Sequence, residues 1–144
     1  MIDSFDKKYA FLSNFAPCDI LFEGLIYPTV EHAYQAAKTV VKEERVIVQH
    51  TTTPGKAKRI GKKVRLRSDW EEVKEEVMLD LLCRKFFQDK FRRLLVVTGD
   101  AELIEGNYWH DNFWGICSCS RCAETLGKNK LGEILMAIRD VIGV

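Results

Sequence analysis

The sequence lacks the features that would place it outside the class of ordinary globular domains. No apolar run approaches the roughly 20 residues that cross a bilayer, and the start MIDSFDKKYA lacks the basic and then apolar pattern of a secretion signal. Low-complexity tracts, internal repeats and long Pro/Gly/Ser linkers are also absent. We therefore expect one domain over residues 1–144, located in the cytoplasm and making no membrane contact. Nothing in the sequence indicates an oligomeric state.

Neither sign of charge dominates, because 22 Lys and Arg residues balance 21 Asp and Glu residues to give a net charge of +1. This balance gives no strong nucleic-acid footprint over the whole chain. Locally the charge is uneven, since residues 56–67 contain seven basic side chains and residues 69–80 contain six acidic ones. Two interpretations stay open. The two segments pair on one surface, or the basic segment, with Lys56 and Arg59, faces a phosphate group.

Five cysteines are an odd number for a disulfide framework, and no secretion signal accompanies them. Three of them, Cys117, Cys119 and Cys122, lie within six residues. A closed zinc site needs four ligands, and His110, Cys18 or Cys83 are candidates for the fourth. The prediction is nevertheless reduced thiols, with no metal and no cofactor, and zinc at Cys117, Cys119 and Cys122 or redox chemistry are the alternatives.

Periodicity and punctuation predict an α+β protein that is mainly helical, with a few short strands. We expect a hairpin with its turn at Glu23-Gly24, and a helix that starts at a Thr29 cap and continues through Glu44. Further helices are expected over residues 56–63, 70–86, 88–95 and 131–142, and strand-like pieces over residues 96–98 and 103–105. Ser68 and Glu71 match a capping box, and Asn129 is a candidate N-cap.

The helix after Thr29 carries an unusual polar face. Glu31, Tyr34, Gln35 and Lys38 lie at offsets of 0, 3, 4 and 7, which places an acid, a phenol, an amide and an amine on one side. Such a carboxylate can move protons or stabilise a cationic transition state, and such an amine can act as an anion partner or an imine-forming nucleophile. A solvated face is the alternative. Neighbouring His32 is a candidate substrate contact, with a purely structural role as its alternative.

A second candidate site is the aromatic segment GNYWHDNFWG, residues 106–115. Aromatic rings between Asn, Asp and His side chains are typical of a pocket that stacks a planar heterocycle and orients it through polar edges. Trp109, Asp111, Trp114 and Gly115 are the candidate binding residues. Packing in a small satellite core is the alternative for each ring.

Several separated segments together resemble the NADAR superfamily, which includes the YbiA-like N-glycosidases. The matching pieces are FLSNF (residues 11–15), YPTVEHAYQAAK (27–38), TGD (98–100), FWG (113–115) and NKLG followed by LM (129–136). They span nearly the whole chain in the family's order.

This resemblance implies cleavage of the N-glycosidic bond between a ribose and a base. The implied substrate is a phosphorylated ribosylaminopyrimidine of the riboflavin pathway or a related nucleotide. An alternative is removal of ADP-ribose from guanine in nucleic acid, and a third reading is a non-catalytic ADP-ribose-binding module. The resemblance also places functional polar residues at Asn14, Glu31 and Lys38, with Phe15 beside the first of them. Glu31 and Lys38 are the predicted catalytic pair.

Overall fold

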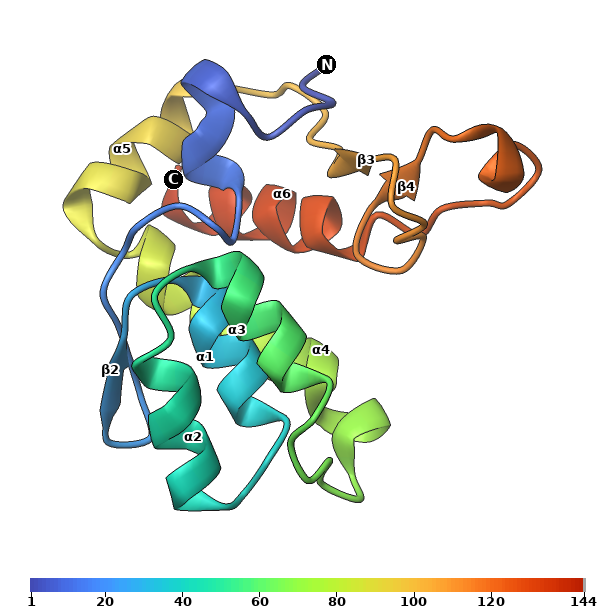
Figure 1. Ribbon diagram of the computed structural model, residues 1–144. Coiled ribbons are helices and arrows are strands. Elements are labelled where there is room, and N and C mark those ends of the chain that lie inside the picture. Colours follow the sequence, from blue (N-terminus) through green and yellow to red (C-terminus); the bar gives the residue numbers. More distant parts are fainter. Residues whose placement is uncertain (144) are drawn as a thin grey trace. The chain divides into compact units, whose positions relative to one another are not determined.

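The computed structural model describes residues 1–143, which form two compact units (Figure 1). The central unit runs from Asn14 to Gln88. The terminal unit combines Met1–Ser13 with the chain from Asp89 onward. Helices dominate both units and the strands are short, so the predicted α+β, mainly helical fold is confirmed. In the described part of the chain no helix is both long enough and apolar enough to cross a membrane.

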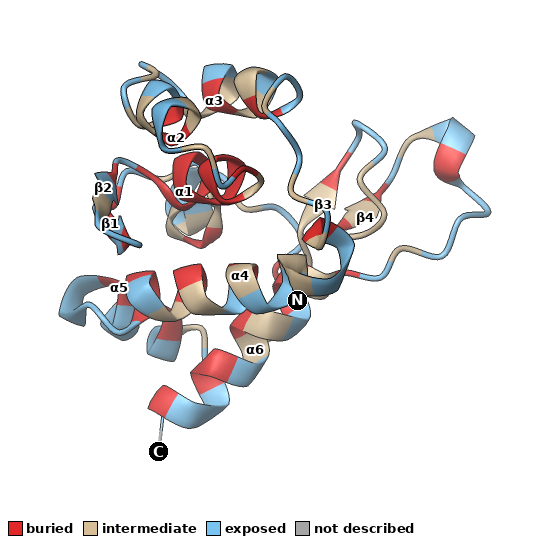
Figure 2. Ribbon diagram, turned by 90° about the horizontal axis from the view of Figure 1, so that it is seen from below, coloured by how far each residue is buried: buried red, intermediate tan, exposed pale blue. Residues whose placement is uncertain are grey.

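The central unit is built around one short helix. It contains β1 (Ile20–Phe22), β2 (Leu25–Tyr27), α1 (Val30–Ala37), α2 (Lys42–Gln49), α3 (Pro54–Gly61) and α4 (Trp70–Phe86). All eight residues of α1 are buried, because α2, α3, α4 and both strands pack against it. Figure 2 shows α1 in the buried colour along its length. A polar side chain on α1 is therefore held inside the unit.

The predicted hairpin forms as expected. Strand β1 pairs antiparallel with β2 in the register Ile20 to Tyr27 and Phe22 to Leu25. The two turn residues have positive φ, 46° at Glu23 and 87° at Gly24, which is the geometry that joins two strands with the correct twist. The hairpin is followed directly by Pro28 and by Thr29, the residue that precedes α1.

The expected helix through Glu44 is wrong, because α1 ends at Ala37 and α2 starts at Lys42. Residues that follow α1 form hydrogen bonds with the segment between α1 and α2 and hold it in a non-helical conformation. The Lys38 carbonyl accepts a hydrogen bond from the Arg67 backbone N–H at 2.7 Å, and the Thr39 carbonyl accepts one from Arg45 Nε at 2.7 Å. Val41 donates its N–H to the Thr39 hydroxyl instead of to a helical carbonyl.

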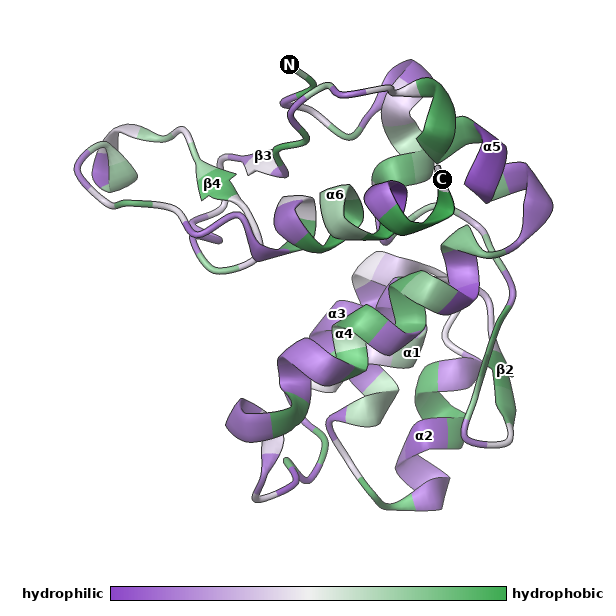
Figure 3. Cartoon of the chain, turned by 180° about the vertical axis from the view of Figure 1, so that it is seen from behind, coloured by the Kyte–Doolittle hydropathy of each residue, from purple (hydrophilic) through white to green (hydrophobic). Residues whose placement is uncertain are grey.

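Helix α4 agrees with its predicted range, but its predicted capping box does not form. The N-cap residue is Asp69, whose side chain makes no capping hydrogen bond. Arg67 holds this carboxylate in a two-pronged contact at 2.6 and 3.1 Å. Figure 3 shows the first half of α4 as largely hydrophilic and its second half as more hydrophobic, and the second half contributes Met78, Leu81, Leu82 and Phe86 to the core.

The terminal unit contains η1 (Lys7–Leu12), α5 (Asp89–Val97), β3 (Gly106–Asn107), β4 (Ile116–Cys117), η2 (Ser120–Cys122) and α6 (Lys130–Ile142). The expected strand over residues 96–98 is wrong, since α5 continues to Val97 and the Thr98 hydroxyl bonds to the Leu95 carbonyl. Leu103 forms a single bridge with Ile2. Strands β3 and β4 run parallel.

Asn129 precedes α6 as predicted, but its side chain does not cap the helix. Its amide group instead donates to the Leu103 carbonyl at 2.9 Å and accepts from the Glu105 N–H at 3.0 Å. The loop before α6 provides hydrogen-bond acceptors for the first turn of this helix. The carbonyls of Phe113 and Trp114 accept hydrogen bonds from the N–H groups of Lys130 and Leu131. Asn129 thus joins the start of α6 to the chain before β3.

Candidate active site

Helix α1 begins where its sequence predicts. The Thr29 hydroxyl accepts a hydrogen bond from the His32 N–H at 3.0 Å and so caps the helix. The Asn14 carbonyl accepts a hydrogen bond from the Glu31 N–H at 3.1 Å. Asn14 is therefore anchored to the first turn of α1, directly beside the predicted acid.

Glu31 is 7% exposed, and one of its carboxylate oxygens accepts a hydrogen bond from Gln35 Nε2 at 2.8 Å. Gln35 is 3% exposed, and its own amide oxygen accepts no hydrogen bond from the described residues. That oxygen lies against Gly61 of α3, at the position where a Cβ would stand. A glycine at 61 is thus what allows Gln35 to lie between α1 and α3 and hold Glu31.

Lys38 follows α1 directly and is half-buried. Burial lowers the pKa of the Lys38 amine, the negative charge of Glu31 opposes this shift, and the positive charges of Lys58, Lys62 and Lys74 add to it. The Lys38 amine also lies 5.7 Å from the centre of the Tyr34 ring. The predicted acid and amine therefore interact electrostatically inside the central unit.

Tyr34 is buried against the start of α4. Its ring centre lies 5.1 Å from that of Trp70, and the two planes are tilted by 59°. Both rings are nearly inaccessible, 7% for Tyr34 and 5% for Trp70. The Tyr34 ring therefore packs between α1 and the start of α4.

Phe15 and His32 differ in exposure. Phe15 is 43% exposed, so its ring is accessible beside Asn14. The His32 ring is 1% exposed, with Nδ1 2.7 Å from the Thr29 hydroxyl and Nε2 2.8 Å from the Thr51 carbonyl. Burial lowers the pKa of His32. Because a carbonyl only accepts, Nε2 carries the proton, and both ring nitrogens are used within the protein. This geometry favours the structural alternative for His32.

The basic segment presents its residues differently. Lys56 and Arg59 are exposed on α3, and the Lys56 amine donates to the Thr52 hydroxyl at 3.2 Å. Lys58 on the same helix and Lys62 just after it are the residues whose charges act on Lys38. Lys58, Lys62 and Lys74 were not predicted from the sequence as neighbours of Lys38. Within a run of basic residues, periodicity alone does not tell which ones face α1.

The aromatic segment lies in the terminal unit. Asp111 accepts hydrogen bonds from the N–H groups of Phe113 at 3.1 Å and Trp114 at 2.9 Å, which folds the chain into a tight turn. The Phe113 and Trp114 rings meet edge to face, with centres 4.8 Å apart. Trp109 is 48% exposed and packs on Tyr108. Asp111 thus shapes the loop, while Trp109 presents an accessible ring.

Gly115 is required by its surroundings. A Cβ at this position would collide with the carboxylate and the carbonyl of Glu105. Asn107 donates from Nδ2 to Glu105 Oε2 at 3.0 Å and to the Asp111 carbonyl at 2.9 Å. The Glu105 carboxylate is therefore fixed beneath the turn that carries Trp114. The three cysteines of residues 117–122 lie in the same unit.

Lys85 was not predicted as a site residue, yet it is the most strongly perturbed lysine described. Its side chain is fully buried near the end of α4. Burial lowers the pKa of Lys85 to about 7, and the negative charge of the Cys18 sulfur in its thiolate form partly opposes the shift. A buried lysine with such a pKa is typical of functional sites, although structural networks produce it too.

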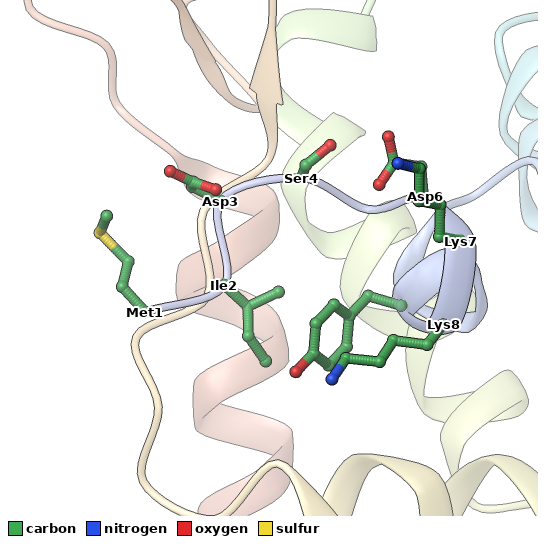
Figure 4. Close-up of a pocket in the computed structure, with 8 residues that line it drawn as sticks. Met1, Ile2, Asp3, Ser4, Asp6, Lys7 and Lys8 are labelled. Atoms are coloured by element: carbon green, nitrogen blue, oxygen red, sulfur yellow. The ribbon is translucent and has the colours of Figure 1, made fainter.

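A hollow lies at the N-terminal segment of the terminal unit (Figure 4). It is lined by Met1, Ile2, Asp3, Ser4, Asp6, Lys7, Lys8 and Tyr9. None of the predicted site residues belongs to it. Its two carboxylates, Asp3 and Asp6, are exposed, so we do not assign the chemistry to it.

The central unit therefore brings together a buried carboxylate, a half-buried amine of lowered pKa and several further ammonium groups. These groups suit cleavage of a bond at a sugar carbon that becomes cationic, next to an anionic group. The NADAR domain model matches residues 2–143. The chain belongs to the NADAR family.

Two of its relatives are named N-glycosidases. The chain is 36% identical over 144 residues to N-glycosidase YbiA of Escherichia coli, covering 98% of this chain and 86% of that protein. It is also 36% identical to an N-glycosidase of Nostoc punctiforme, over 94% of this chain and 87% of that one. The NMR structure of E. coli YbiA superposes with a TM-score of 0.81 at 35% identity, over 98% of this chain and 84% of that one. The prediction of a hydrolase acting on N-glycosyl bonds is confirmed.

A third relative is a longer protein. A riboflavin biosynthesis protein of Vibrio vulnificus is 35% identical over 140 residues, which cover 94% of this chain and 36% of that longer protein.

Proposed function

We propose that this chain hydrolyses the ribose–base N-glycosidic bond of a phosphorylated ribosylaminopyrimidine, with Glu31 and Lys38 as the catalytic residues. The observation that carries the proposal is the buried Glu31 carboxylate, oriented by Gln35 and electrostatically coupled to Lys38. The relative named as a riboflavin biosynthesis protein supports this substrate class. The family model spans both units, so we treat them as one NADAR domain.

In the proposed reaction the bond between the ribose anomeric carbon and the base nitrogen breaks, and both bonding electrons leave with the nitrogen. Water adds its oxygen to the anomeric carbon, and its protons are shared between the ribose product and the departing nitrogen. Glu31 stabilises the cationic sugar and accepts a proton from the water. Asn14 and Gln35 keep the Glu31 backbone and carboxylate in place.

Lys38 has two roles compatible with its surroundings. As an ammonium it binds the anionic part of the substrate. As a free amine it attacks the anomeric carbon, the base leaves with the electrons of the glycosidic bond, and opening of the ribose ring then gives an imine that water later hydrolyses. The lowered pKa of Lys38 supports the second role, because it raises the fraction of free amine near neutral pH. Borohydride added during turnover attaches the ribosyl fragment to Lys38 only if the imine forms.

The remaining predicted residues are assigned to substrate binding. Lys56 and Arg59 on α3 are exposed and suit an approach to the phosphate. Phe15, in the same unit as Glu31, offers an accessible ring for the base, and removing a stacking ring should weaken binding by about 1–3 kcal/mol. Trp109 and Trp114, in the terminal unit, stay sequence-based predictions. Asp111 and Gly115 shape the loop that carries Trp114.

The deciding experiment incubates the purified protein with the ribosylaminopyrimidine phosphate and, separately, with DNA that carries ADP-ribose on guanine. The proposal is supported if the unmodified protein releases the free aminopyrimidine base from the first substrate and the Glu31→Gln variant does not. Release of ADP-ribose from the DNA alone favours the second candidate function, which the exposed basic side chains of α3 motivate. Tight binding of ADP-ribose without any turnover favours a binding module.

A further inference from the structure

The terminal unit contains a loop with little core of its own. Between β4 and α6 the chain forms η2 and returns, and Figure 1 shows this orange segment extending away from α6. Leu126 is 91% exposed, and Ser118, Ser120, Arg121 and residues 123–126 are also exposed. Apolar burial therefore contributes little to holding this loop together.

Four side chains converge where the loop meets β4. They are His110, Cys117, Cys119 and Cys122, and their four potential ligand atoms all lie within 4.8 Å of one another. His110 Nδ1 is 3.2 Å from the Cys119 sulfur, 3.5 Å from the Cys122 sulfur and 3.9 Å from the Cys117 sulfur. One imidazole nitrogen thus faces all three thiols.

These separations fit a tetrahedral metal centre. With Zn–S near 2.3 Å and Zn–N near 2.0–2.1 Å, a regular tetrahedron places its sulfurs about 3.8 Å apart and its nitrogen about 3.6 Å from each sulfur. The three observed nitrogen–sulfur distances scatter around that value. A chance meeting of three thiols and an imidazole would not require all three to face the same nitrogen.

The groups around the cluster favour thiolate ligands. The backbone N–H groups of His110 and Cys119 point at the Cys117 sulfur, at 3.3 and 3.5 Å. Such donors stabilise negative sulfur, as the second layer of a metal site commonly does. Arg121 Nη1 lies 3.4 Å from His110 Nε2. When Nδ1 binds a metal, Nε2 carries a proton, so the exposed Arg121 side chain must then turn away from the ring.

We propose that His110, Cys117, Cys119 and Cys122 bind one Zn²⁺ ion in a closed Cys₃His site that ties η2 to β4. Three thiolates with one imidazole are a ligand set that zinc prefers. Four protein ligands leave no open coordination position, so the ion is structural. Cysteine spacing in the sequence supplied three of these ligands and left His110, Cys18 and Cys83 as alternatives for the fourth. The fold selects His110, and Cys18 and Cys83 belong to the other unit.

The first test measures metal content. Protein expressed with added zinc and passed through a desalting column should contain one equivalent of zinc by elemental analysis. Cys119→Ser should contain at least tenfold less, while Cys83→Ser, which alters a thiol outside the cluster, should keep the full equivalent. No zinc in the unmodified protein, iron in its place, or equal zinc in Cys119→Ser and the unmodified protein would overturn the proposal.

The second test identifies the histidine and does not require removal of any of the three cysteines. Apo protein prepared with a chelator and titrated with Co²⁺ should show the strong visible bands of a tetrahedral site, together with thiolate charge-transfer absorption that saturates at one equivalent. His110→Cys should keep the tetrahedral bands and increase the charge-transfer intensity by about a third, because a fourth thiolate replaces the imidazole. Weak octahedral bands, or an unchanged spectrum in His110→Cys, would contradict this ligand set.

Discussion

Gln35 donates a 2.8 Å hydrogen bond to the carboxylate of Glu31 one turn earlier on α1, and both side chains are nearly inaccessible. The amide of Gln35 is in turn confined by Gly61 on α3. The Glu31 carboxylate is therefore held by a packing contact between two helices. This arrangement fixes its direction before substrate binds, which lowers the cost of reaching the transition state.

Replacing either of the proposed catalytic residues, Glu31 or Lys38, should abolish turnover without unfolding the protein. We expect Glu31→Gln and Lys38→Ala to reduce kcat at least 100-fold, on the scale of a lost acid, base or charged group. Steady-state rates and circular dichroism check this. The exposed α2 residues Glu43 and Lys42 offer matched controls, Glu43→Gln and Lys42→Ala, which should retain full activity. Normal rates in the α1 variants would remove these residues from the mechanism.

The pH profile should report on the lysines around Lys38. Lys58 and Lys62 lower the pKa of Lys38, so Lys58→Met and Lys62→Met should each raise it. If the free amine reacts, the acidic limb of the kcat profile moves to higher pH. If the ammonium binds an anion, the basic limb moves to higher pH instead. Lys42→Met should leave both limbs in place. Unmoved limbs in Lys58→Met and Lys62→Met would contradict the electrostatic effect of these lysines on Lys38.

Gly61→Ala should test the support of Glu31 through Gln35. The new methyl group occupies the place of the Gln35 amide oxygen, so Gln35 must turn away from Glu31. We expect kcat to fall by at least tenfold while KM changes little. Gly55→Ala is the matched control, because its Cβ meets nothing, and it should stabilise α3 by about 0.5–1 kcal/mol. Equal rates in the two variants would show that Gln35 does not orient the acid.

The exposed basic residues of α3 should act on the phosphate alone. The double variant Lys56→Ala with Arg59→Ala should raise KM for the phosphorylated substrate and weaken its dependence on salt. The dephosphorylated analogue should react as before, and comparison of the two KM values is the measurement. Equal losses for both substrates would instead support a structural role for this segment.

Lys85 should make stability depend on pH. Its pKa is about 7 in the folded protein and about 10.4 in an unfolded chain, so between these values the unfolded state binds more protons. Its contribution to the free energy of unfolding therefore rises with pH, by up to about 1.4 kcal/mol per unit. Urea unfolding at several pH values should show this slope, and Lys85→Met should lose it. If the free energy of unfolding depended on pH in the same way in the unmodified protein and in Lys85→Met, the lowered pKa of Lys85 would be contradicted.

Much of the fold could be read from local patterns. Thr29 caps α1, Glu23 and Gly24 form the hairpin turn, and α4 follows its apolar stripe, because these signals act within a few residues. Two of the failures share one cause. The break after Lys38 and the unused Asn129 cap each arise from a hydrogen bond to a residue far along the chain, Arg67 and Leu103 respectively, which local patterns do not evaluate. The failed capping box is different, because Asp69 pairs with Arg67 only two residues away.

The sequence by itself determined the family, the polar face that carries Glu31 and Lys38, and the three thiols of the cysteine cluster, since each is a pattern of residue types at fixed spacing. Only the tertiary structure decided that this polar face is buried, that Lys58, Lys62 and Lys74 act on Lys38, and that His110 joins the thiols. These properties depend on which distant segments pack together, and packing sets both the burial that shifts a pKa and the distances that let four ligands meet.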